Sequence, residues 1–248
     1  MDAFTDTSFL LAACMLLGAA LYSSVGHAGA SAYIALMALF GVAPPVMRPT
    51  ALTLNILVAG LTSYRYVRAG AFSWPVLWPF LVGAMPMAFI GGAINLPAHI
   101  YRPLVGVVLL VSAVRLLWPR DLRATRQTQA PPVPYAIAMG AGLGLLAGLT
   151  GTGGGIFLSP LLIFLAWAPP RTVSGVSAVF ILCNSVTGLL GNLASLRALP
   201  PELPIYAGAV LAGALIGTSF GIRLAVPGIL KALGIVLLIA GMKLIGVY

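Results

Sequence analysis

Apolar residues fill most of the chain in long runs, and the charged residues fall between these runs. Uncharged stretches extend over residues 7–47, 69–101, 127–170, 172–196 and 203–222. A membrane-spanning helix needs only ~20 predominantly apolar residues, so every run is long enough for at least one span. The pattern predicts an all-α polytopic membrane protein.

Gly/Pro clusters and charges divide the runs into ten segments. These cover 7–24, 28–41, 49–66, 72–95 and 103–118, and then 134–149, 153–168, 172–194, 203–225 and 229–247. Between the two groups lies the polar, proline-rich stretch "WPRDLRATRQTQAPPVP" (118–134). We therefore predict a first membrane repeat over 1–118, a cytoplasmic linker over 119–133 and a second repeat over 134–248.

The two halves align with each other. "YSSVGHAGASAYIALMALFGVAPP" (22–45) matches "AGLTGTGGGIFLSPLLIFLAWAPP" (147–170) at an offset of 125, and two later stretches match at offsets of 130 and 128. A repeat with an odd number of crossings inserts its two copies in opposite orientations. The sequence thus predicts two inverted-topology repeats of about five segments each, with broken or re-entrant helices at the glycine-rich motifs.

The basic residues favour one orientation of these segments. With the N-terminus outside, the cytoplasmic set is Arg65, Arg68, Arg115, Arg120, Arg123, Arg126, Arg171, Arg223 and Lys231. The outer set is Arg48, Arg102, Arg197 and Lys243. This bias predicts a protein of the inner, cytoplasmic membrane with both termini extracytoplasmic. Segments 28–41 and 153–168 are short for a ~30 Å core, so each either crosses fully or forms a re-entrant hairpin with its predecessor.

The stretch "GLTGTGGG" (148–155) interrupts an apolar region with five glycines and two threonines. Non-helical backbone at membrane depth is tolerated only where protein buries it or where it lines a cavity. A helix beginning near Gly153 directs its free N–H groups and positive dipole end at the break, which favours an anion. The matching break in the first half is "YSSVGHAGAS" (22–31), so we expect a substrate site near the midplane between the two breaks.

Polar residues in the third segment of each half either line the same cavity or join helices by hydrogen bonds. The predicted substrate-binding residues are Ser24, Gly26, His27, Gly29, Ser31, Thr50, Asn55, Thr150, Gly151, Thr152, Gly153, Gly154, Gly155, Ser177 and Asn184. His27 either binds an anion or carries a proton, or it is a neutral side chain bonded to a backbone carbonyl. Four other glycines are expected only to allow close helix packing: Gly83, Gly91, Gly213 and Gly221.

Charge narrows the function further. All four carboxylates (Asp2, Asp6, Asp121 and Glu202) fall in termini or loops, so a carboxylate proton relay and a cation site are not expected. The 13 basic residues are scattered, which argues for an orientation signal and against a nucleic-acid partner despite the net charge of +9. Cys14 and Cys183 suggest neither a metal site nor a disulfide, and no cofactor is expected. The expected partners are a small anion and the lipid bilayer, with a homodimer left open.

The two glycine-containing copies and the stretch "PPRTVSGVSA" (169–178) resemble the sulfite exporter TauE/SafE family of membrane transporters. The resemblance covers nearly the whole chain. It implies that the substrate is sulfite, an organosulfonate or a related sulfur oxyanion, moved outward. In the first copy the glycine block is reduced to "GHAGA" (26–30), so the two halves need not contribute equally. An anion channel, or a transporter of another small anion or organic acid, remains an alternative; an enzyme is not expected.

Overall fold

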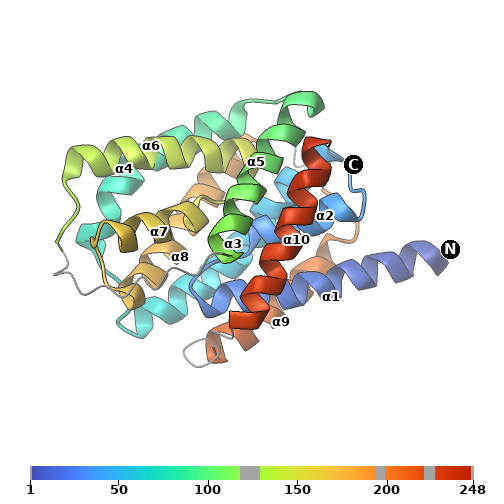
Figure 1. The fold of residues 1–248 in the computed structure, drawn as a ribbon, viewed down its shortest axis with the longest axis horizontal. Coiled ribbons are helices and arrows are strands. Elements are labelled where there is room, and N and C mark those ends of the chain that lie inside the picture. The colour runs from blue at the N-terminus through green and yellow to red at the C-terminus, as the bar shows by residue number, and fades with distance from the viewer. Residues whose placement is uncertain (1, 118–128, 194–198, 221–226, 247–248) are drawn as a thin grey trace.

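A computed structural model describes residues 2–117, 129–193, 199–220 and 227–246. Within these ranges the protein consists of ten α-helices and contains no strand (Figure 1). They are α1 (Asp2–Ser24), α2 (Ala30–Leu39), α3 (Pro44–Arg68), α4 (Trp74–Ala93), α5 (Ala98–Leu117), α6 (Val133–Thr150), α7 (Gly155–Phe164), α8 (Pro170–Gly191), α9 (Leu203–Phe220) and α10 (Pro227–Ile245).

Four helical stretches are long and apolar enough to cross a membrane: Asp6–Ser24, Trp74–Ala93, Val133–Thr150 and Pro170–Gly191. Asp2 and Asp6, which the sequence placed in a terminus, therefore lie in α1, because this helix begins before the apolar run does. Large apolar side chains such as Phe9, Leu17 and Phe164 are exposed on the outside of the bundle, as lipid-facing positions require. The prediction of an all-α polytopic membrane protein is therefore confirmed.

The short helices α2 and α7 have ten residues each. At ~1.5 Å per residue they extend about 15 Å, half of the hydrocarbon core, so neither crosses it alone. Tyr22 of α1 bonds to Ser31 of α2 over 2.7 Å, and Gly18 faces Ala32. Such pairs form when α2 folds back on α1; whether 28–41 crosses fully or forms a re-entrant hairpin stays a prediction.

The two halves of the chain interlock. The most extensive pairs are α1 with α9, α4 with α6, α5 with α10, α4 with α8 and α3 with α8, each joining one helix from each half. The sequence alignment matches α1 with α6 and α4 with α9. Under this match, the pair of α1 and α9 corresponds to the pair of α6 and α4. The inverted orientation of the halves and the boundaries at 118 and 134 remain predictions.

Glycines make the contacts between these paired helices possible. A Cβ atom on Gly83 or Gly91 of α4 would overlap backbone carbonyl oxygens of α6, and one on Gly213 of α9 would overlap the carbonyl of Leu16. The packing interpretation is confirmed for these three glycines. Gly221 lies outside the described residues.

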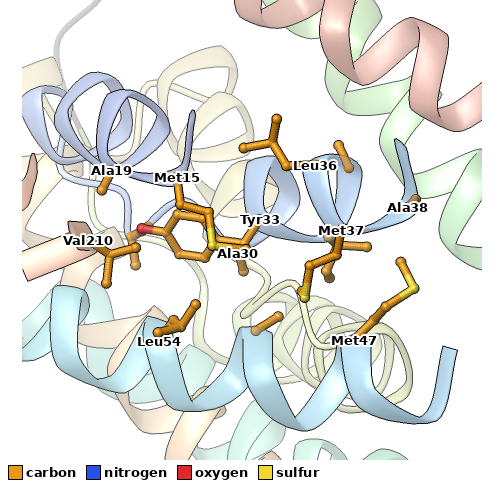
Figure 2. Close-up of a cluster of buried hydrophobic side chains, with 14 of the residues drawn as sticks. Met15, Ala19, Ala30, Tyr33, Leu36, Met37, Ala38, Met47, Leu54 and Val210 are labelled. Carbon is orange, nitrogen blue, oxygen red and sulfur yellow. The ribbon is translucent and has the colours of Figure 1, made fainter. Parts of the chain in front are cut away.

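The side chains of α2 are buried between α1 and α3 (Figure 2). Tyr33 is fully buried beside Met15 of α1 and Leu54 of α3, and Met37 extends toward Met47 of α3. A helix of ten residues gains little stability from its own hydrogen bonds, so this packing holds it in place. It thereby fixes the position of the break that precedes α2.

Candidate functional site

Both glycine-rich stretches interrupt helices. In the first break, between α1 and α2, the φ values of Gly26 and Gly29 are 82° and 97°. In the second break, between α6 and α7, Gly151, Gly153 and Gly154 have φ values of 83°, 73° and 74°. Side chains other than glycine rarely adopt this left-handed region, so the glycines are required by the backbone itself.

The two breaks approach each other along α3. The first lies against the C-terminal half of this helix, where the hydroxyl of Tyr66 donates to the carbonyl of Ser24 over 2.8 Å. The second lies against the N-terminal half, where Gly151 contacts Arg48. Both reach Asn55, near the middle of α3.

Asn55 joins three elements. Its Oδ1 accepts a hydrogen bond from the N–H group of Ala30 over 3.1 Å, at the start of α2, and its Nδ2 donates to Ser185 Oγ of α8 over 3.2 Å. Gly153 of the second break lies directly beside Nδ2, where a Cβ would be too close. Asn55 is fully buried and holds the helices together at the point where the breaks meet.

His27 connects the first break to α7. Its Nε2 lies 3.0 Å from Ser159 Oγ and 3.2 Å from the carbonyl oxygen of Gly155, and Ser159 Oγ lies 2.7 Å from Ser177 Oγ. Nδ1 lies 3.2 Å from the carbonyl oxygen of Val25. The structure therefore brings together His27 and Ser177, which the sequence singled out, and adds Ser159, which it did not.

The remaining hydroxyl groups of the breaks bond mostly to neighbouring protein atoms. Ser24 Oγ donates to the carbonyl of Leu21 over 2.6 Å, and Ser31 pairs with Tyr22 as described above. Thr150 and Thr152 share a hydrogen bond of 2.9 Å between their hydroxyl groups. These four residues shape the breaks, and no property of their geometry requires a ligand.

Three other predicted substrate-binding residues, Thr50, Gly154 and Asn184, differ from these hydroxyl groups in their hydrogen bonding. Within the described part of the chain, both amide atoms of Asn184 and the hydroxyl of Thr50 are buried without a hydrogen-bond partner. An unsatisfied buried polar group costs about 1–3 kcal/mol, which a ligand or water relieves when it binds. The N-cap of α7, Gly154, has no side chain to cap this helix, and its first N–H groups have no partner within it.

Arg48 departs from the sequence prediction. It was expected in an extracytoplasmic loop, but it lies in the first turns of α3 with only 5% of its surface exposed. Its guanidinium donates to the carbonyls of Ile94, over 2.8 Å, and of Gly91 and Gly92 at the C-terminal end of α4. The segment boundary at residue 49 was wrong because Pro44 and Pro45 start the helix earlier than the apolar pattern does; the assignment of Arg48 to the outer side stays a prediction. Proline at the first helical positions is the signal that locates this boundary.

Metal ligands do not gather in the described ranges, where no three His, Cys, Asp or Glu side chains come together. The polar centre consists instead of backbone N–H groups, hydroxyls, two asparagines and one histidine. Such a set supplies hydrogen-bond donors and acceptors but no full negative charge.

An all-helical membrane bundle with two interrupted helices and a polar centre is the architecture of a membrane transporter. The comparisons with known proteins agree. The family described as "Sulfite exporter TauE/SafE" matches residues 10–244, and the chain belongs to this family. A protein of Sinorhizobium fredii named "Probable membrane transporter protein y4hK" is 37% identical over 228 residues, which cover 90% of this chain and 92% of that protein. No solved structure matches the chain.

Proposed function

We propose that this transporter exports a small sulfur-containing oxyanion, sulfite or an organosulfonate, through a site between the two helix breaks. The observation that carries the proposal is the meeting of the breaks at Asn55. There the start of α2 and the glycine end of the second break lie within reach of one side chain. Helix N-termini favour negative charge, and two of them converge here.

The second break supplies the main anion contacts in this proposal. The N–H groups at the start of α7 have no capping side chain from their own N-cap, and the buried amide of Asn184 has no partner among the described residues. An oxyanion accepts hydrogen bonds from N–H groups and from an amide NH2 group. Thr50, with its unpartnered hydroxyl, is assigned to the same site.

His27 is assigned the role of a protonatable neighbour. Both ring nitrogens face carbonyl oxygens, which only accept hydrogen bonds, and a doubly protonated ring offers a donor to each. Binding of an anion nearby favours that charged form by Coulomb attraction. A proton bound together with the anion would reduce the charge moved across the membrane.

The direction follows from the membrane potential, which changes the free energy of an anion by about 2.3 kcal/mol per charge per 100 mV. An inside-negative potential drives anions outward, so export requires no coupling ion in principle. We place the protein in the cytoplasmic membrane with both termini outside, as the basic residues indicate.

Flux through proteoliposomes tests the proposal. We expect vesicles with the purified protein to release loaded sulfite or sulfoacetate at a rate that saturates with concentration, and to release acetate much more slowly. A saturating flux distinguishes a transporter from a channel of the same scaffold. If folded protein moves no sulfur oxyanion, the proposed substrate is wrong.

A further inference from the structure

A cavity of about 240 Å³ lies between the start of α3, the α4–α5 connection and the end of α8. Pro45, Arg48, Asn95, Tyr101 and Asn192 belong to its wall. The loops and helix ends that form it were all assigned to the extracytoplasmic side by the distribution of basic residues. We call it the Arg48 cavity.

Arg48 contributes the charge of this wall, and no carboxylate of the described residues lines the cavity. Its guanidinium bonds to two carbonyls of α4 and to that of Ile94, which follows α4, and these offer partial negative charge but no full counter-ion. Its Nε is buried and has no partner among the described residues. A buried cation without a counter-ion is costly, and such residues in membrane proteins mark ion and substrate pathways.

The cavity shares its wall with the second break. Gly151 packs against the backbone and the Cγ of Arg48, and the hydroxyl of Tyr101 donates to the carbonyl of Thr150 over 3.2 Å. The cavity and the second break are therefore neighbours that share Arg48 and Tyr101 as contact residues.

We propose that the Arg48 cavity is a second anion-binding site, in which the buried guanidinium attracts a small oxyanion at the outer mouth of the pathway. A water molecule occupies about 30 Å³ in the liquid, so the cavity has room for such an anion and several waters. The role of the Arg48 cavity as the position from which the exported anion leaves rests on the proposed function. The binding of an anion in this cavity does not depend on that function.

Anion titration of the purified full-length protein in detergent tests this site, with sodium sulfite and sodium sulfate as probes at constant ionic strength. Arg48→Gln removes the charge, and Ala98→Phe adds bulk from an exposed position of the cavity wall and leaves Arg48 in the chain. Arg102→Gln is the matched control, because Arg102 is exposed on α5, the helix that also carries Ala98, and does not line this cavity.

We expect calorimetry to show a sulfite-binding step that weakens at least tenfold in Arg48→Gln and in Ala98→Phe and is unchanged in Arg102→Gln. Wild-type affinity in folded Arg48→Gln would show that Arg48 only caps α4 and would overturn the proposal. If Arg48→Gln does not fold, wild-type affinity in Ala98→Phe overturns it equally. Arg48-dependent binding without any flux in vesicles would leave this site standing and would reject the proposed export.

Discussion

The two helix breaks share a sequence pattern but differ in how the protein holds them. In the first, Tyr33 and Tyr66 donate to carbonyl oxygens of the segment, and Asn55 accepts from the N–H group of Ala30. The second is held at its start, where Thr150 bonds to Thr152. From there to α7 the chain consists of glycines.

In the proposed transport, this difference gives the two breaks different roles. The backbone of the first break is bonded by side chains of α2 and α3, and its own His27 bonds to α7. The second break keeps bare backbone next to a helix start, and the unpartnered amide of Asn184 lies on α8, which packs against α6 and α7. If the proposed function is correct, the second break binds the anion and the first positions it.

The largest effect is expected from Gly154→Leu. This residue has a φ of 74°, and even a Cβ would approach Phe180 and Ala147 to within 3.3 Å, so a leucine displaces the start of α7. We expect sulfite flux to fall to the level of empty vesicles while the protein still inserts. Gly142→Leu is the control, since nothing lies within 4 Å of a Cβ there. Normal flux in Gly154→Leu would show that the anion does not bind at the second break.

Asn184→Ala tests the role of the unpartnered amide. We expect the KM for sulfite to rise about tenfold, which corresponds to about 1.4 kcal/mol. The apparent melting temperature in detergent should stay the same or rise, because no protein hydrogen bond of this side chain is lost. A lower melting temperature with an unchanged KM would make Asn184 a structural residue.

Asn55→Ala is the counterpart in the first half and should behave in the opposite way. It removes two buried hydrogen bonds, so we expect a loss of about 1–3 kcal/mol in stability, seen as a lower melting temperature. Equal stability losses in Asn55→Ala and Asn184→Ala would contradict the distinction between the two breaks.

His27→Gln sharpens the comparison at the contact between the breaks. Glutamine can still donate to the carbonyl of Gly155 but cannot take up a proton in the physiological range. We expect flux to persist within a factor of a few and to lose its dependence on pH between about pH 5 and 8. An unchanged pH profile would exclude His27 as the protonated group.

The smallest effect is expected from Tyr33→Phe. The hydroxyl donates to the carbonyl of Ala28 over 2.6 Å, and its loss should cost about 0.5–1.5 kcal/mol of stability. If the first break only positions the site, sulfite flux measured below the melting transition should stay close to that of the wild type. A large loss of flux in this variant would mean that the first break also binds the anion.

Much of the architecture was predictable from the apolar runs, because spans must be apolar and glycines must stand where the backbone turns or helices touch. The lengths of α2 and α7 were less predictable, because the apolar pattern continues beyond each helix end. Arg48 was misplaced for a related reason. Hydropathy marks where lipid can surround the chain, whereas a helix can begin earlier and turn a charged side chain into the protein.

The sequence by itself determined that this is a helical membrane protein, that two glycine-rich stretches interrupt it, and that no carboxylate lies in its apolar runs. Only the tertiary structure decided which polar groups meet. It placed Asn55 between the breaks, joined His27 to Ser159 across 132 positions and turned Arg48 toward α4. The reason is physical: local pattern governs which backbone can lie in a bilayer, but a hydrogen-bond partner far along the chain is supplied by packing alone.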